Sequence, residues 1–128
     1  MLGLVIAAKD IETRKQMADL LIDAGYDVMV TNSAARAIDN VLNKTARVLL
    51  LGTEVGEFTS AELVPLLKKC NRKLSIILVS NDTSLPLIRK LRSEGIFYHA
   101  LKPVSREDRE EIRQAVQCAF QRFSEQPG

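Results

Sequence analysis

A regular alternation between short apolar runs and longer segments of helical spacing constrains the fold more than any other feature. The apolar runs predict strands at residues 2–8, 26–31, 47–51, 74–80 and 97–101. Between and after them, apolar residues recur three or four positions apart, as the buried face of an amphipathic helix requires. Helices that connect strands in this way produce a parallel sheet covered on both faces, because the crossovers are right-handed. The sequence therefore predicts a doubly wound α/β fold with five strands and five helices.

Capping residues locate the ends of three predicted helices. Gly25 ends the first helix, and Ser33 is the expected N-cap of the second. Ser105 and Asp108 form a capping-box pattern that begins the last helix. The apolar stripe of this last helix is expected at Ile112, Ala115, Val116, Ala119 and Phe123.

The third and fourth helices are bounded by similar signals. The third is expected after a loop that ends at Ser60, with an apolar face of Leu63, Leu66, Leu67 and Cys70. Thr83 or Ser84 caps the fourth helix, and Gly95 ends it. Its apolar face is expected to consist of Leu85, Ile88 and Leu91.

Length and charge limit the classes of function. The chain of 128 residues suits one domain, expected at residues 1–123, with 124–128 as a tail or linker stub. A net charge of +2 argues against direct nucleic-acid binding, which needs a clustered excess of lysine and arginine. We expect a soluble, cytoplasmic protein without membrane association, because no apolar run approaches membrane-spanning length and no signal segment is evident.

The side chains that most catalytic or metal centres require are scarce. His99 is the single histidine, and the two cysteines, Cys70 and Cys118, lack metal-type spacing. We expect both cysteines to be reduced, structural thiols. The glycines have no phosphate-loop or dinucleotide spacing. The sequence predicts no enzyme, no metal ion and no cofactor.

Ligands of a doubly wound sheet bind beyond the carboxyl ends of its strands. In this chain those ends carry Ala8-Lys9-Asp10, Gly52-Thr53-Glu54, Ser80-Asn81-Asp82 and Lys102-Pro103. Any functional site is therefore expected among these residues.

With these segments the chain resembles the receiver domain of response regulators in two-component, phosphorelay signal transduction. Residues 4–25, 48–60, 76–80 and 95–103 carry the resemblance, which covers nearly the whole chain. It implies a flavodoxin-like sheet of strand order 2-1-3-4-5 in a bacterial signalling protein. It also implies a cis peptide before Pro103 and places His99 where receivers often have an aromatic switch residue.

The resemblance assigns roles to the strand ends. In receivers one aspartate accepts the phosphoryl group, an acidic pair helps to hold Mg²⁺, and a lysine and a hydroxyl contact the phosphoryl group. Ser80 and Lys102 match the hydroxyl and the lysine. Gly52 occupies the acceptor position, and Ala8 and Lys9 occupy the acidic-pair positions. The nucleophile and the metal ligands are missing together, which implies a degenerate receiver, or pseudo-receiver.

Such a domain is expected to signal through protein partners without being phosphorylated on an aspartate. The face formed in receivers by the fourth helix, fifth strand and fifth helix is the expected contact surface. Here this face draws on Arg89, Arg92, His99 and the exposed side of residues 106–121. The resemblance also allows a homodimer through the same face.

Other interpretations of the strand ends stay open. Lys9, Lys102 and Ser80 could form a basic pocket for a small anion or phosphorylated metabolite. Glu54 could replace the acceptor if the alignment shifts by two residues. Glu54 or Asp10 could instead pair with the lysines, or the lysines could point into water. For Ser80 the simpler interpretation is a hydroxyl bonded to local backbone, and for His99 it is ordinary packing.

Overall fold

The computed structural model describes residues 3–43, 46–82 and 84–125, with side chains described as far as residue 122. Five strands form one parallel sheet: β1 (Gly3–Ala7), β2 (Asp27–Thr31), β3 (Val48–Leu51), β6 (Ser75–Val79) and β7 (Tyr98–Ala100). Their order is β2-β1-β3-β6-β7. Since β6 and β7 are the fourth and fifth predicted strands, this order is the predicted 2-1-3-4-5.

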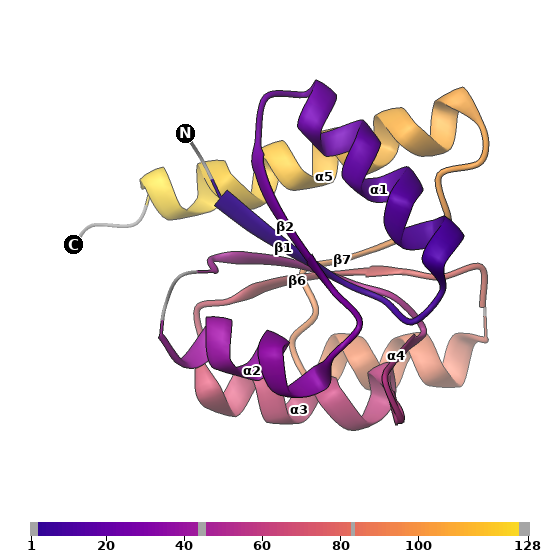
Figure 1. Ribbon diagram of the computed structural model, residues 1–128. Helices are drawn as coiled ribbons and strands as arrows, with labels where there is room; N and C mark the ends of the chain where they lie inside the picture. Colours follow the sequence, from indigo (N-terminus) through magenta and orange to yellow (C-terminus); the bar gives the residue numbers. More distant parts are fainter. Residues whose placement is uncertain (1–2, 44–45, 83, 126–128) are drawn as a thin grey trace.

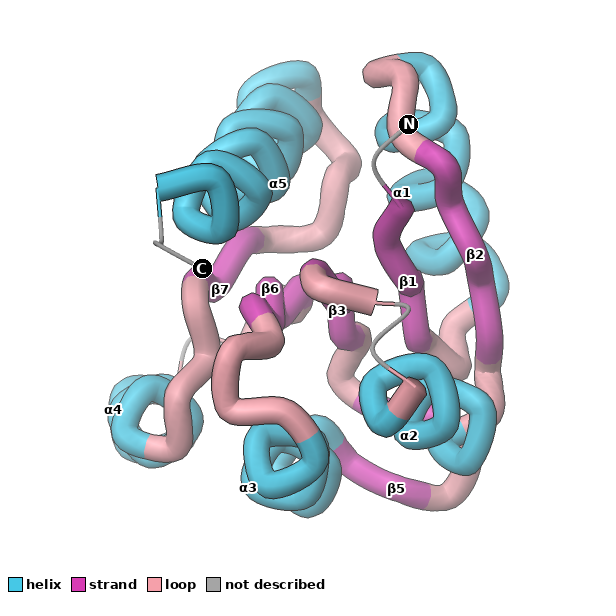
Figure 2. Tube along the Cα trace, turned by 90° about the vertical axis from the view of Figure 1, so that its left-hand side faces the viewer, coloured by secondary structure: helices cyan, strands magenta, loops and turns pink. Residues whose placement is uncertain are grey.

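Helices cover both faces of the sheet, as predicted. In the described part of the chain they are α1 (Ile11–Asp23), α2 (Ala34–Leu42), α3 (Ser60–Cys70), α4 (Leu85–Ser93) and α5 (Arg106–Glu125). Figures 1 and 2 show α1 and α5 on one face and α2, α3 and α4 on the other. The flavodoxin-like, doubly wound fold is therefore confirmed.

Two apolar cores hold the helices to the sheet. Successive strand residues point to opposite faces. Val5 and Ala7 consequently pack with residues of α2, α3 and α4, whereas Leu4 and Ile6 pack with residues of α1 and α5. Every residue of β3 and β6 is buried. Their uninterrupted apolar runs, without alternation, follow from this burial on both faces.

A short hairpin after β3 was not predicted. It pairs β4 (Glu54–Val55) with β5 (Phe58–Thr59) in antiparallel fashion, where the sequence suggested only a loop. Gly56 turns the chain at φ 58°, a left-handed conformation that glycine adopts without strain. Val55 is fully buried against the core below. Strands of two residues are too short to show an alternating pattern, so the sequence gives no signal for them.

Side-chain caps begin most of the helices. Ser33 accepts a hydrogen bond from the Arg36 N–H at 3.3 Å, as predicted. Ser105 and Asp108 exchange the two bonds of the predicted capping box. For α3 the cap is Thr59, which forms a capping box with Glu62.

Some predictions concern residues at the limits of the described part of the structure, or outside it. Ser84 is the N-cap of α4 but makes no side-chain capping bond, and Thr83 lies outside the described residues. The Phe123 side chain and residues 126–128 of the expected tail also lie outside them. Helix α5 continues to Glu125, and the proposed domain boundary stays a prediction.

Other expectations were wrong in detail. Leu66 and Leu85 were predicted to be buried, but they are 44% and 63% exposed. On α4, Leu87 packs against the core together with Leu91. Cys118 was expected to be a structural thiol, but it is exposed on α5. A periodic pattern marks a helical face, but which residues at its margins are covered depends on the neighbouring elements.

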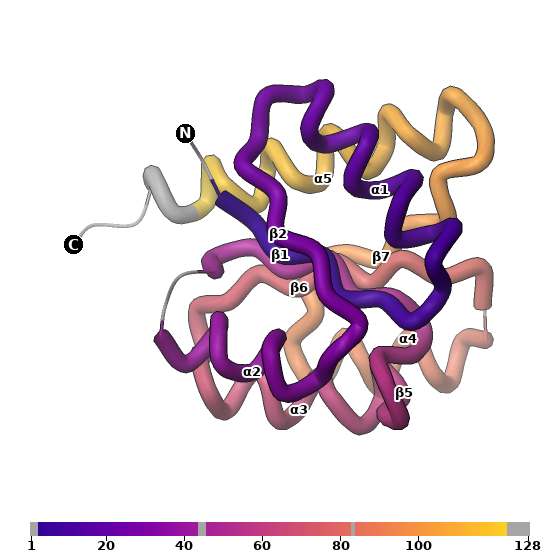
Figure 3. Tube along the Cα trace, viewed as in Figure 1, coloured from indigo at the N-terminus to yellow at the C-terminus, as the bar shows by residue number. Residues whose placement is uncertain are grey.

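The four strand ends that the sequence singled out lie together. The chain leaves β1, β3, β6 and β7 at one edge of the sheet, the right-hand end in Figure 3. This carboxyl edge is where the candidate site must be sought.

Candidate functional site

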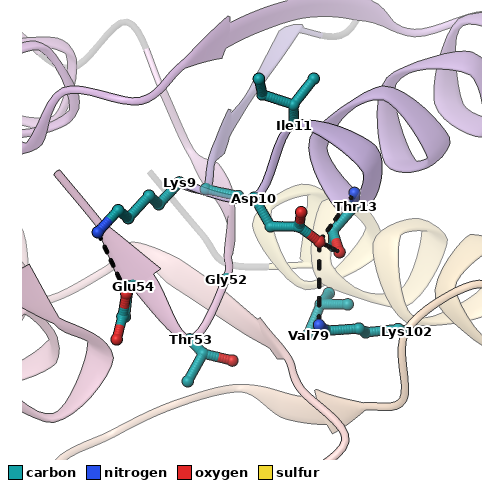
Figure 4. A pocket seen from close by; sticks show the side chains of 10 residues that line it. Lys9, Asp10, Ile11, Thr13, Gly52, Thr53, Glu54, Val79 and Lys102 are labelled. Atoms are coloured by element: carbon teal, nitrogen blue, oxygen red, sulfur yellow. Dashed lines mark hydrogen bonds and ion pairs between the residues drawn. The ribbon is translucent and has the colours of Figure 1, made fainter.

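A cavity of about 640 Å³ opens at the carboxyl edge of the sheet. Its lining comes from the ends of β1, β3, β6 and β7 and from the start of α1 (Figure 4). The lining residues are Ala8, Lys9, Asp10, Ile11, Thr13, Gly52, Thr53, Glu54, Val79 and Lys102. The structure thus brings together the predicted positions Ala8, Lys9, Gly52 and Lys102.

The floor of this cavity is formed where two neighbouring strand ends lie close together. Ala7 pairs with Leu51, so the next residues, Ala8 and Gly52, lie side by side. A Cβ atom added to Gly52 would lie 2.9 Å from the Ala8 Cβ and 3.4 Å from its Cα. The Gly52 N–H donates to the Ala7 carbonyl oxygen at 2.9 Å and holds this spacing. Position 52 therefore admits only glycine unless one strand end moves.

The two lysines of the cavity each meet a carboxylate. Lys9 Nζ lies 3.7 Å from Glu54 Oε2, with the two side chains 62% and 54% exposed. Lys102 Nζ lies 3.9 Å from Asp10 Oδ2. Figure 4 shows the two pairs on opposite sides of Gly52. Of the interpretations left open, the structure has the ion-paired one, although exposed pairs of this kind contribute little to stability.

Asp10 has a second role as the N-cap of α1. Its carboxylate accepts hydrogen bonds from the Thr13 N–H at 3.3 Å and from the Thr13 hydroxyl. These bonds, the hydroxyl bond first, lower the pKa of Asp10 below its usual value, and the charge of Lys102 acts in the same direction. The carboxylate is therefore ionised at neutral pH. An aspartate directly before a helix is a common N-cap, so residue type alone carried a signal for this cap.

Ser80 is buried beneath the site and bonds to its surroundings. Its Oγ accepts from the Asp82 N–H at 3.0 Å and lies 3.4 Å from the Thr53 hydroxyl, which donates to it. The local interpretation of this serine is the one observed. Among the described residues, those that line the cavity include both lysines but not Ser80.

His99 is half-buried on the edge strand β7. Its Nε2 lies 3.0 Å from the Ser80 carbonyl oxygen, to which it donates in the tautomer protonated at Nε2. The ring therefore fixes the end of β6 and is not free on the surface. Arg89 and Arg92, the other predicted contact residues, are exposed on α4.

The resemblance implied a cis peptide before Pro103, and this expectation was wrong. The Lys102–Pro103 peptide is trans. The loop turns instead through a hydrogen bond from the Val104 N–H to the Lys102 carbonyl oxygen at 2.8 Å. A second bond, from the Lys102 N–H to Asn81 Oδ1 at 3.0 Å, ties this loop to the end of β6.

The cavity does not fit the Mg²⁺ ion that receivers use. Asp10 and Glu54 are its only carboxylates among the described lining residues, and each is paired with a lysine. No group of three or more histidine, cysteine, aspartate or glutamate side chains in the described part of the chain could hold a metal ion. A hard divalent cation needs several oxygen ligands and is repelled by nearby ammonium groups.

Neither a family model nor a curated protein matches the sequence. Solved structures do match. A CheY-like response regulator receiver domain protein from Methanospirillum hungatei superposes with a TM-score of 0.83 at 17% identity, over 98% of this chain and 99% of that one. A response regulator receiver domain protein from Clostridium thermocellum gives a TM-score of 0.84 at 15% identity, over 97% and 98% of the two chains.

A third similar structure is the signal receiver domain of a modulated diguanylate cyclase from Desulfovibrio desulfuricans. Its TM-score is 0.79 at 19% identity, over 95% of this chain and 96% of that one. At such low identities the likeness establishes the fold. This chain has the fold of CheY-like response-regulator receiver domains.

In the residues that the structure describes, no helix has both the length and the apolar character needed to cross a bilayer.

Proposed function

We propose that this chain is a pseudo-receiver: a signalling domain that acts through protein contacts and is not phosphorylated on an aspartate. The close approach of Gly52 and Ala8 carries the proposal. At the position of the phospho-acceptor there is no side chain, and the packing leaves no room for one. In the proposed role, the protein is a cytoplasmic component of two-component-type signalling, without enzymatic activity and without direct contact to nucleic acid.

The altered charges support the same conclusion. Where receivers have an acidic pair, this chain has Ala8, which is buried, and Lys9, whose ammonium group pairs with Glu54. Glu54 is a poor substitute acceptor, because its carboxylate is engaged by Lys9 and its backbone belongs to the β4–β5 hairpin. Loss of the nucleophile is thus accompanied by loss of the metal site.

The proposed partner surface is the face formed by α4, β7 and α5. It exposes Arg89 and Arg92 together with several large apolar side chains, an arrangement that suits a mixed polar and apolar interface. The exposed apolar residues are Leu85 on α4 and Tyr98 on β7, with Leu101 and Val104 in the loop between β7 and α5. The Tyr98 hydroxyl donates to Glu111 at 2.6 Å and so joins β7 to α5 within this face. A homodimer through this face is part of the proposal.

Phosphorylation assays test the proposal directly. The protein is incubated with Mg²⁺ and acetyl phosphate, and its mass is measured; amide spectra are recorded with Mg²⁺ and beryllofluoride. We expect no phosphoryl adduct and no beryllofluoride-dependent shifts at residues 52–54 or 80–82. A Gly52→Asp variant is expected to stay inactive as well, since the acidic pair is still missing. A covalent adduct on the unaltered protein would refute the pseudo-receiver.

The self-association of the α4–β7–α5 face has its own test. Sedimentation is compared for the unaltered protein and for Leu85→Glu, with Leu66→Glu on α3 as the matched control, because Leu66 is also exposed but lies on another helix. If the face forms a homodimer, only Leu85→Glu should shift the protein toward a monomer. Equal behaviour of both variants and the unaltered chain would leave a different protein as the partner.

A second candidate is an anion-binding domain, which the presence of Lys9 and Lys102 in one cavity favours. The carboxylates of Glu54 and Asp10 weaken this candidate, because they lie beside the two lysines and would repel a phosphate group. Titration with inorganic phosphate in the absence of Mg²⁺ distinguishes the two. Saturable shifts at Lys9 and Lys102 would favour anion binding over the pseudo-receiver.

A further inference from the structure

The strand-end cavity has an apolar floor that no side chain fills. Ala8 and Val79 are buried there, and Gly52 contributes only backbone. At the rim, Ile11 is 71% exposed, more than any other large apolar residue described. The volume of about 640 Å³ falls within the range of sites for small molecules, roughly 300–1,000 Å³. The cavity therefore offers apolar contact at its rim, through Ile11, and space for a small ligand.

The charges around this floor are balanced in sign. Two ammonium groups and two carboxylates face the cavity, arranged as the pairs Lys9–Glu54 and Lys102–Asp10. A simple anion would gain two attractions and two repulsions, and a simple cation would meet the same balance. A ligand that carries both an ammonium and a carboxylate group can satisfy one charge of each pair. Charge complementarity thus selects a zwitterion over an ion of single sign.

Backbone hydrogen bonds hold both ion pairs in place, but a ligand group could replace one partner of each pair. The Lys9 N–H donates to the Glu54 carbonyl oxygen at 2.8 Å, and Asp10 is held by its cap on α1. The side-chain separations of 3.7 and 3.9 Å lie near the upper limit for ion pairs, and the side chains are partly exposed. Exchange of one partner for a ligand group therefore costs little, because such pairs contribute about 0–1 kcal/mol.

We propose that this cavity binds a small zwitterion with an apolar body, of the kind represented by an aliphatic α-amino acid or a short peptide with free ends. The ligand carboxylate pairs with Lys102 or Lys9, and its ammonium group pairs with Asp10 or Glu54. Its apolar part lies against Ile11. The proposal does not depend on whether the domain is phosphorylated, so its failure leaves the proposed function untouched.

Titrations followed by amide NMR spectra test this binding. The probes are L-leucine and leucyl-leucine, with three controls: leucinamide, which is only a cation, isocaproate, which is only an anion, and inorganic phosphate. We expect saturable shifts at residues 8–13, 52–54 and 102 with at least one zwitterion. Each singly charged control should bind about threefold to fivefold more weakly. This ratio of affinities corresponds to the free energy of one exposed ion pair.

Variants tie the binding to the named charges. At least one of Lys9→Met, Lys102→Met and Asp10→Asn should weaken zwitterion binding by about threefold to fivefold, according to which lysine and which carboxylate the ligand engages. Asparagine also caps helices, so Asp10→Asn removes the charge but keeps the start of α1. Lys15→Met is the matched control, because Lys15 is an exposed lysine of α1 that does not line the cavity. This variant should bind the zwitterion as tightly as the unaltered protein.

Several results would overturn the proposal. They are the absence of saturable shifts with both zwitterions up to their solubility limits, and equal affinity for isocaproate or phosphate, which would identify an anion site. Equal affinity for leucinamide would likewise identify a cation site. Unchanged binding in all three charge variants would place the ligand elsewhere.

Discussion

The two halves of the carboxyl edge are joined in different ways. At the ends of β6 and β7, a hydrogen bond from the Lys102 N–H to Asn81 joins the two ends, and the resemblance matches Ser80 and Lys102 to the hydroxyl and the lysine of receivers. At the ends of β1 and β3 the residues are Ala8, Lys9 and Gly52, and Ala8 lies against Gly52. One half is joined through side chains, whereas the other is joined by close packing at a glycine.

This difference matters because the two arrangements do not tolerate substitution equally. A hydrogen-bonded side chain can be released by one substitution. A strand end that packs against glycine cannot accept a larger residue without movement of the backbone, and interiors resist such movement. In the proposed pseudo-receiver, the β1–β3 half is therefore the part of the edge that most firmly prevents phosphoryl chemistry.

The largest expected effect concerns this backbone contact. Gly52→Ala should destabilise the protein by about 1–3 kcal/mol, as overpacking does elsewhere. Gly3→Ala, in the same sheet, is the control, because a Cβ there would meet its nearest neighbour at an ordinary 3.8 Å. The free energy of unfolding from urea denaturation measures both. Equal stabilities of the two variants would show that Ala8 and Gly52 can separate at no cost.

The next effect belongs to the β6–β7 half. Ser80→Ala removes the acceptor of the Asp82 N–H and should cost about 1 kcal/mol in the free energy of unfolding. Ser84→Ala is the matched control, since Ser84 is exposed and makes no side-chain capping bond. A loss no larger for Ser80 than for Ser84 would mean that the buried hydroxyl does not organise this strand end.

A smaller, pH-dependent effect concerns Asp10, which joins the two halves through Lys102. Its pKa is lower in the folded protein than in the unfolded chain, because Thr13 bonds to the ionised form. This contribution to stability is present above the unfolded-state pKa of about 4 and is lost as the pH falls through the folded-state value. The stability difference between the unaltered protein and Asp10→Asn should therefore shrink on acidification below about pH 4. A difference that stays constant would contradict the assignment.

The smallest effect is expected for the exposed pair of the β1–β3 half. Lys9→Met and Glu54→Gln should each change the free energy of unfolding by about 0.5 kcal/mol or less, with a coupling of similar size in the double variant. Added salt should reduce this coupling further. A coupling of several times this value would mean that the ion pair, and not the glycine contact, holds the β1 and β3 ends together.

Much of the fold could be predicted from local patterns. The apolar runs gave the five sheet strands, and the capping signals at Ser33 and at Ser105 with Asp108 marked helix starts correctly. The patterns failed where neighbouring elements decide the outcome. Leu66 and Leu85 fit a helical stripe but lie at its uncovered margin, and the β4–β5 hairpin depends on the burial of Val55.

The candidate site could be predicted only in part. The four segments at the strand ends were named from topology, and four of the five named phospho-site positions line one cavity. Ser80 does not, because its hydroxyl bonds to the backbone of the next loop. The cavity is also lined by Ile11, Thr13 and Val79, which were not predicted as site residues. The cavity brings them together from elements that are distant in the chain.

By itself, the amino-acid sequence determined the alternation of strands and helices and the absence of carboxylates at positions 8, 9 and 52. These depend on residue type and on spacing along the chain, so they can be read before folding. Only the tertiary structure decided that Gly52 is required by its contact with Ala8, that each lysine has a carboxylate partner, and that His99 turns toward Ser80. Each of these is a distance between separate strand ends, which exists only after the sheet has assembled.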